Sequence, residues 1–305
     1  MVLQGSFRLR SPAKTLSIGL AAIVCFFFAN ARIYADNIYV SDAASNTIVE
    51  YNSNGQGSIF ASGLDAPAAL AFDESGNLYV ANQGNGTIEK FGTNGVGLVF
   101  LSGLSNLGGL TFDSRGNLYV MEDATIQRFG TNGVGSLFAT TQSTLFGADG
   151  LAFDSNSNLY AAVDKMLMGT VEEYNTNGAN VGFLSAITGE PFGLAFDSGG
   201  NLYISELGGD ILKFNSAQGN GSVFASGLAN PRGLAFDSSG NLYVANSFDG
   251  TVEEFNSNGT GTVFASGMGR PSGIAIQVPE PSTWAMLILS IGTLLGGLQF
   301  RRRLS

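Results

Sequence analysis

The stretch Gly233-Leu-Ala-Phe-Asp-Ser-Ser-Gly-Asn-Leu-Tyr-Val-Ala-Asn246 decides the fold, because close copies of it recur along the chain. Its most regular part is the triplet Asn-(Leu/Ile)-Tyr. This triplet begins at six positions: Asn37, Asn77, Asn117, Asn158, Asn201 and Asn241. Successive copies are 40, 40, 41, 43 and 40 residues apart. A fixed period of this size indicates one supersecondary unit that buries its faces only by stacking on copies of itself.

Each repeat contains four short runs rich in Val, Ile, Leu, Phe and Tyr, separated by Gly, Asn, Asp and Ser. This composition is typical of strands and turns. The first two runs are joined by Asp-x-x-Gly-Asn, as in Asp237 to Asn241, and the last two by Asn-Gly, as in Asn258-Gly259. Asn and Gly tolerate the positive φ of tight hairpins. Four antiparallel strands per unit, repeated radially, predict an all-β propeller.

The two ends of the repeat region indicate how the ring closes. The first unit begins at its second strand, within 36–42, and the last unit ends with a lone first strand, within 272–276. Pairing these two segments completes a sixth blade and leaves no open sheet edge along the ring. We therefore predict one six-bladed domain over residues 36–277.

The repeat resembles known propeller sequences. Pro231-x-Gly-Leu-Ala-Phe-Asp-x-x-Gly-Asn-Leu-Tyr-Val-Ala-Asn246, followed by a Val/Ile-x-x-Phe-Asn strand, is similar to the NHL repeat. It also resembles the six-bladed gluconolactonase and regucalcin-like superfamily. The resemblance covers residues 36–277 and implies the fold, whereas propellers host many unrelated activities.

The N-terminal segment 1–35 has the pattern of a secretory signal peptide. Arg8, Arg10 and Lys14 precede an apolar run from 16 to 28, and Ala29-Asn30-Ala31 supplies small residues for cleavage after Ala31 or Ala35. Cys25 is the only cysteine and lies in the apolar run, so we expect a mature chain without disulfides or thiol chemistry.

The C-terminal segment 278–303 combines a short motif, an apolar stretch and a basic cluster. Residues 283–300 are long enough to span a bilayer as a helix, and basic residues stay on the cytoplasmic side. The motif residues are Pro279, Glu280 and Pro281, and the cluster is Arg301, Arg302 and Arg303. The combination resembles the PEP-CTERM sorting signal. The resemblance implies an exosortase as partner, transient insertion in the inner membrane, and a destination at the bacterial surface or in the extracellular matrix. A plain membrane anchor is the alternative.

Composition excludes several classes of function. All of the 24 Asp and Glu residues except Glu280 lie between Asp36 and Gln277, whereas half of the 14 Lys and Arg lie outside, which gives this region a net charge of −16. Such an excess argues against nucleic-acid binding. The chain has no histidine. Zinc sites, Ser-His-Asp catalysis and the His-dependent lyase mechanisms of similar propellers are therefore not expected.

A hard cation such as Ca²⁺ is one candidate ligand, because oxygen-bearing side chains recur at the ends of the second strands. These residues are Asp42, Asn82, Glu122, Glu206 and Asn246. Their recurrence in nearly every blade favours the alternative that they cap turns by accepting backbone hydrogen bonds.

The residue before the Gly of each first strand is expected to face the channel mouth, and it is not repeated. The six are Ala68, Gly108, Asp149, Phe192, Arg232 and Ser272. In the gluconolactonase-like family, metal-binding Glu, Asn and Asp come from such positions, and only Asp149 matches that pattern. The resemblance to a metal-dependent lactone or ester hydrolase is thereby weakened but not removed, because the oxygens at the ends of the second strands could substitute for the missing ligands.

Two insertions in the fourth copy point to a binding surface. The loop 139–148 is three residues longer than its equivalents, and the loop 164–169 is two residues longer. Insertions on one face of a repeat protein are common places for function. Met166 and Met168 could form an apolar recognition patch there or fold over the mouth as a lid. We expect Asp149, Asp164, Lys165, Glu190, Phe192 and Arg232 to surround them.

These features predict a surface-sorted propeller that binds a polysaccharide or protein of the matrix without catalysis. The alternative is a metal-dependent hydrolase of the gluconolactonase type, and a spacer domain without a ligand is a third reading.

Overall fold

The computed structural model describes residues 36–142, 150–164, 169–184, 187, 189–215 and 221–277. Residues Ala35–Val278 form one compact unit. The predicted signal peptide and the predicted transmembrane helix lie outside the described residues. Within the part of the chain that the structure describes, no helix has the length and apolar character needed to span a bilayer.

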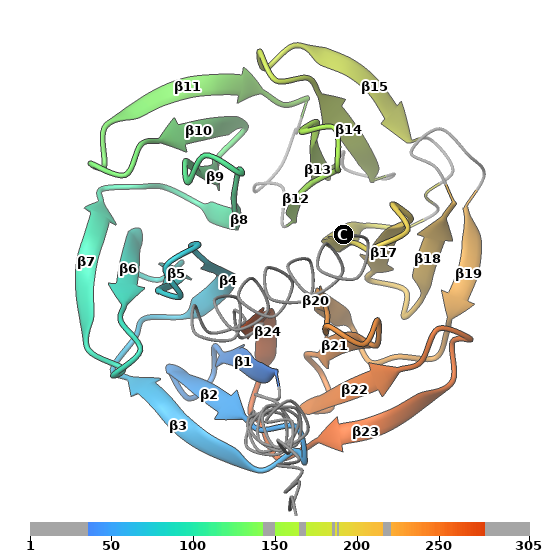
Figure 1. The fold of residues 1–305 in the computed structure, drawn as a ribbon. Coiled ribbons are helices and arrows are strands. Elements are labelled where there is room, and N and C mark those ends of the chain that lie inside the picture. The colour runs from blue at the N-terminus through green and yellow to red at the C-terminus, as the bar shows by residue number, and fades with distance from the viewer. Residues whose placement is uncertain are drawn as a thin grey trace, which may run out of the picture. The chain divides into compact units, whose positions relative to one another are not determined.

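The described strands form six four-stranded antiparallel sheets arranged radially around a central channel (Figure 1). We number the blades 1 to 6 from the N-terminus and name the strands of each blade a to d from the channel outwards. The a strands are β24 (Pro271–Gln277), β4 (Pro67–Phe72), β8 (Leu107–Phe112), β12 (Leu151–Phe153), β16 (Pro191–Phe196) and β20 (Pro231–Phe236). The b strands are β1 (Asn37–Asp42), β5 (Leu78–Asn82), β9 (Leu118–Glu122), β13 (Leu159–Val163), β17 (Leu202–Glu206) and β21 (Leu242–Asn246).

The outer half of each blade is a c–d pair of strands. The described c–d turns are of the expected Asn-Gly type, with positive φ at glycines such as Gly55 and Gly259, and residues 216–220, which join strands c and d of blade 5, lie outside the described residues. The c strands are β2 (Thr47–Tyr51), β6 (Thr87–Phe91), β10 (Thr125–Phe129), β14 (Thr170–Tyr174), β18 (Ile211–Phe214) and β22 (Thr251–Phe255). The d strands are β3 (Gly57–Ser62), β7 (Gly97–Ser102), β11 (Gly135–Thr140), β15 (Asn180–Leu184), β19 (Ser222–Ala225) and β23 (Gly261–Ala265).

The ring closes through blade 1, as predicted. The last described strand, β24, pairs antiparallel with β1, which aligns Ile274 with Val40 and Ala275 with Tyr39. The inner strand of blade 1 therefore comes from the C-terminal end of the propeller and its other three strands from the N-terminal end. The six-bladed, N-to-C-closed propeller is confirmed.

Aromatic side chains fill the spaces between neighbouring blades. Tyr79 of strand b contacts Phe100 of its own blade at 5.2 Å between ring centroids, and Phe112 of the next blade at 4.9 Å, both edge to face. Tyr119 and Tyr203 repeat the arrangement. This explains why the Asn-Leu-Tyr triplet recurs: its tyrosine joins one blade to the next and buries a large apolar surface.

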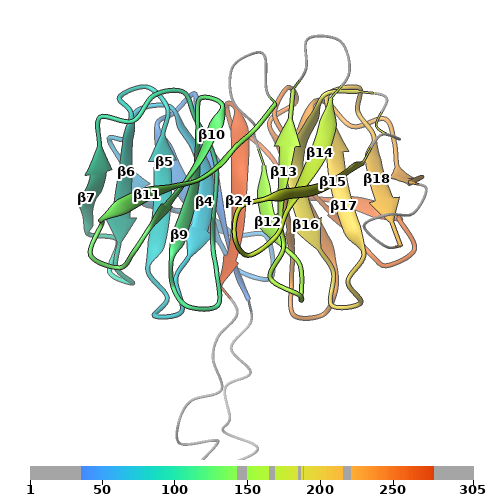
Figure 2. The same cartoon turned by 90° about the horizontal axis from the view of Figure 1, so that it is seen from above.

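The ring has two different faces (Figure 2). The a–b and c–d turns lie on one, which we call the turn face. The b–c turns and the d–a loops lie on the other, where each a strand begins beside the end of its b strand, as Pro67 pairs with Asn82. We call this second face the mouth face.

Candidate functional site

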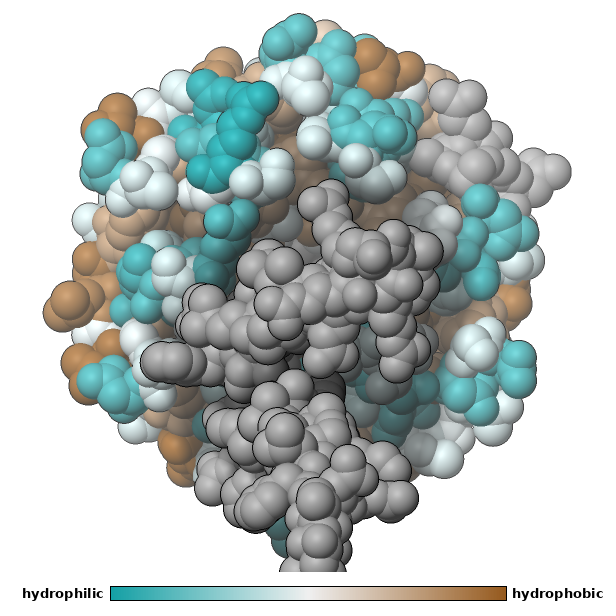
Figure 3. All heavy atoms as spheres, in the orientation of Figure 1, coloured by the Kyte–Doolittle hydropathy of each residue, from teal (hydrophilic) through white to brown (hydrophobic). Residues whose placement is uncertain are grey.

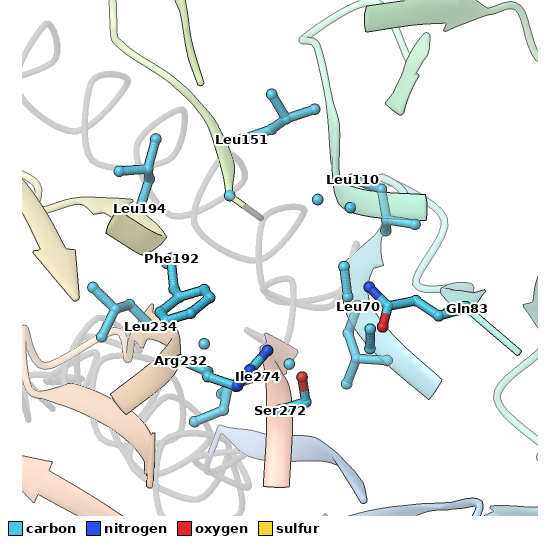
Figure 4. A pocket seen from close by; sticks show the side chains of 18 residues that line it. Leu70, Gln83, Leu110, Leu151, Phe192, Leu194, Arg232, Leu234, Ser272 and Ile274 are labelled. Atoms are coloured by element: carbon cyan, nitrogen blue, oxygen red, sulfur yellow. The ribbon is translucent and has the colours of Figure 1, made fainter. Parts of the chain in front are cut away.

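The central channel contains a cavity of about 110 Å³ near the beginnings of the a strands. Five of the six predicted channel-facing positions line it, and the sixth, Asp149, lies outside the described residues. The described five are Ala68, Gly108, Phe192, Arg232 and Ser272. The leucines that follow, such as Leu194 and Leu234, point away from the channel into the blades (Figure 4).

Small residues hold the inner strands close together around this cavity. A methyl group on Gly193 would overlap the carbonyl oxygen of Arg232 in the next blade, and one on Gly273 would overlap that of Ala68. Ser205 fixes the first of these contacts: its Oγ accepts a hydrogen bond from the Gly193 N–H at 2.8 Å and donates one to the Arg232 carbonyl at 2.6 Å. The backbone around Arg232 is thereby held in place.

The cavity combines one cationic, one aromatic and two neutral polar side chains. The Arg232 guanidinium carbon lies 4.6 Å from the centroid of the Phe192 ring, a cation–π contact that orients the guanidinium. Ser272 lies beside Arg232, and the amide of Gln83 enters from the opposite side (Figure 4). The Gln83 Nε2 donates a 2.6 Å hydrogen bond to the Leu107 carbonyl. The described lining residues include no Asp or Glu.

Sequence reasoning missed Gln83. It is the first residue after strand b of blade 2, and all five equivalent residues in the other blades differ from it. They are Ala43, Asp123, Asp164, Leu207 and Ser247. Variation at this position, beside repeated neighbours, is the signal that could have found it.

Three of the predicted cation ligands accept hydrogen bonds from backbone. The Asp42 carboxylate accepts from the amides of Ala44, Gly269 and Arg270 at 2.8–3.1 Å. Burial raises the pKa of Asp42, but these backbone donors outweigh it and the net pKa is lowered. Glu122 accepts from the Ser105 amide and Glu206 from the Gly189 amide. The contact with Ala44 lies within a b–c turn, as the capping alternative expects, whereas the other contacts hold d–a loops of the mouth face.

Asn82 and Asn246 contact strand c instead. Their Nδ2 atoms donate to Glu89 at 2.8 Å and Glu253 at 2.9 Å. Burial, followed by the nearby Asp249 carboxylate, raises the pKa of Glu253. Among the described residues, no group of three or more His, Cys, Asp or Glu is placed to hold a metal ion. The cation site therefore stays a prediction.

The other predicted ligand-binding residues divide into two sets. Asp164 and Glu190 are described and half-buried on the mouth face, where the Glu190 carbonyl accepts a hydrogen bond from the Leu207 amide. Lys165, Met166 and Met168 lie outside the described residues, as Asp149 does. The structure adds two apolar residues that the sequence reasoning did not single out: Leu207 and Phe248, in the b–c turns of blades 5 and 6, are 40% and 75% exposed.

The C-terminal segment matches a known sorting signal. Residues 277–303 match the PEP-CTERM protein-sorting motif, a signal that is recognised by an exosortase. The motif marks the protein as exported and sorted to the cell surface. No curated protein matches the chain.

Several solved structures are similar in fold. A gluconolactonase from Xanthomonas campestris is 17% identical with a TM-score of 0.62, and the match covers 78% of this chain and 87% of that one. A catalytically inactive virginiamycin B lyase from Staphylococcus aureus, solved with quinupristin, is 13% identical with a TM-score of 0.59 and coverage of 81% and 94%. A protein of unknown function from Bacteroides caccae is 14% identical with a TM-score of 0.61 and coverage of 80% and 100%. At these identities the likeness shows the fold alone.

Proposed function

We propose that this exported, surface-sorted propeller is a non-enzymatic binding protein that holds a component of the extracellular matrix at the mouth of its channel. The composition of the described cavity lining carries the proposal: it offers a guanidinium, an aromatic ring, an amide and a hydroxyl, and no carboxylate. Carboxylates are what a histidine-free chain would use for acid–base catalysis or to hold a hard metal. The described part of the lining supports recognition rather than chemistry.

The lining favours an anionic, hydroxyl-rich ligand, and an acidic polysaccharide has both properties. A guanidinium provides five N–H donors in a planar fork, so Arg232 can serve a sugar carboxylate in addition to its contacts within the protein. Phe192 supplies an apolar ring edge, while Gln83 and Ser272 supply partners for sugar hydroxyls. Arg232 is also the single cationic residue of the described lining in a propeller with a net charge of −16, so it concentrates the attraction for anions at this point.

Retention in the matrix tests the proposal. The full chain and its Arg232→Gln variant are produced in the same strain, and the protein is measured in the matrix fraction and in the medium. A lost charged hydrogen bond corresponds to binding weakened by about tenfold or more, so Arg232→Gln should move most of the protein to the medium. Arg115→Gln, an exposed arginine in an a–b turn, is the matched control and should change nothing. Equal retention of all three proteins would contradict the proposal.

Metal titration and a lactone hydrolysis assay test the hydrolase alternative. The full chain is titrated with Ca²⁺, Mn²⁺ and Mg²⁺ by calorimetry, and lactone hydrolysis is followed in parallel. Under the binding proposal no stoichiometric metal binding and no turnover are expected. Metal binding at micromolar concentration together with lactone hydrolysis would contradict the binding proposal and support the metal-dependent hydrolase.

A further inference from the structure

The six d strands form the outer wall of the ring, and each presents one apolar side chain to solvent at the same place. In five blades this place is the residue paired with the third residue of strand c, and in blade 5, whose c strand begins at Ile211, it is the residue paired with the second, Leu212. The six residues are Ile59, Val99, Leu137, Phe183, Val223 and Val263. Their exposed fractions lie between 58% and 68%. We call this set the rim belt; hydrophobic residues recur along the outline of the ring (Figure 3).

Blade 4 keeps the rim belt although its sequence departs from the repeat. In most blades the pairing of strands c and d is interrupted by a bulge at the phenylalanine of strand d, as at Phe100. This phenylalanine packs inward against the tyrosine of its own blade, as Phe100 does against Tyr79. In blade 4 the bulge lies nearer the c–d turn, so Phe183 pairs with Glu172 and is 68% exposed. The residue that aligns with the belt by sequence is Gly182. The shifted bulge thus places an apolar side chain where glycine would have left a gap.

Each d strand is also an open sheet edge. Among the described strands, β3, β7, β11, β15, β19 and β23 each pair with one neighbour only, their own c strand. A free edge exposes backbone N–H and C=O groups that can pair with another strand. Soluble proteins usually protect such edges with lysine, other charges or proline. None of these six strands contains Asp, Glu, Lys, Arg or Pro.

The uncharged d strands differ in this respect from the c strands beside them. The neighbouring c strands carry charged residues in all six blades, for example Glu253 and Glu254 in β22. The propeller as a whole has a net charge of −16. Two copies that approach through other surfaces therefore repel each other, whereas two rims meet without like charges on the touching strands.

We propose that the rim is a self-association surface, where a d strand of one molecule pairs with a d strand of a second copy of this chain. Two identical edges can meet antiparallel about a two-fold axis, so that each strand supplies the partner for the other's backbone and the rim-belt side chains pack together. Neutral edges that repeat around the ring select a copy of the same chain over a charged partner. Six edges per molecule allow a sheet-like assembly, suited to a protein of the matrix.

Cysteine crosslinking on intact cells tests the rim directly, because the chain has one native cysteine, Cys25, within the predicted signal peptide. Val99→Cys and Val223→Cys are combined in the full chain, which places thiols on the opposite blades 2 and 5. The control combines Ser75→Cys and Ser198→Cys, exposed in the a–b turns of the same two blades. The parent chain gives the background. A short bismaleimide is added and the products are separated by mass.

The proposal expects a ladder of dimers and longer chains from the rim pair and none from the turn pair. Adding Leu98→Glu and Ser222→Glu to the rim pair places like charges on the touching strands and should abolish the ladder, while Leu98→Gln and Ser222→Gln should keep it. Unchanged melting temperatures show that the variants fold. Absence of the ladder, equal ladders from both pairs, or products whose masses are not multiples of the chain would each overturn the proposal.

Discussion

The two faces of the ring differ in how strictly the sequence repeats. On the turn face, five blades carry an aspartate whose Oδ1 accepts the amides of the residues two and four positions later. These are Asp73, Asp113, Asp154, Asp197 and Asp237. On the mouth face, the residue after strand b varies: it is Asp in two blades and Ala, Gln, Leu or Ser in the other four. The comparison teaches that repeated residues build the scaffold and the varied ends of the same strands build the site.

The largest expected effect lies in the repeated half. Tyr203 is buried and contacts Phe224 and Phe236 edge to face at 5.0 and 4.9 Å. Tyr203→Ala should therefore lower the free energy of unfolding by about 3–5 kcal/mol, measured by urea denaturation. Tyr203→Phe keeps the ring and should cost far less. A loss below about 0.5 kcal/mol for Tyr203→Ala is the size expected of a surface substitution. It would contradict the claim that the repeated residues build the scaffold.

An intermediate effect is expected where the scaffold approaches the site. Gly193→Ala places a methyl group against the Arg232 carbonyl and should cost about 1–3 kcal/mol through overpacking. It should also reduce matrix retention, because it displaces the strand that carries Arg232. The control is Gly208→Ala on the same face, where an added methyl group meets no atom within 4 Å. If both variants unfold at the same urea concentration, the close packing of the inner strands does not contribute to the stability of the propeller.

The smallest expected effect concerns the turn-face aspartates. Burial raises the pKa of Asp197, but hydrogen bonds from Asn201 and other groups outweigh it, so its folded-state pKa lies below the ordinary value of 3.8. The unfolded chain then takes up the proton first on acidification. The contribution of Asp197 is complete above about pH 4 and is lost as pH falls through the folded-state pKa.

Asp197→Asn should thus cost about 0.5–1 kcal/mol at pH 7 and less at pH 3. Urea midpoints of the parent and the variant at both pH values measure the difference. A larger difference between the two urea midpoints at pH 3 than at pH 7 would show that the predicted direction of the pH dependence is wrong.

The fold was predictable because most blades repeat the residues that make them: Asn-Gly and Asp-x-x-Gly-Asn set the turns, and the tyrosine of the triplet joins neighbouring blades. The channel-facing role of Phe192 and Arg232 followed from their place before the repeated glycine. Gln83 was missed because its place in the cavity lining depends on how the b–c turn of blade 2 directs its side chain. The contacts of Glu122 and Glu206 with loops 17 residues away, and the shifted bulge of blade 4, depend on tertiary geometry that period alone does not contain.

The closing strand also sets an order of events during biogenesis. β24 is the last described strand to be synthesised and it ends at Gln277, the residue at which the sorting motif begins. Blade 1 cannot acquire its inner strand until nearly the whole propeller has left the ribosome, and contacts between such distant segments form slowly. Closure of the ring is therefore a late step, which waits for synthesis of the chain through Gln277.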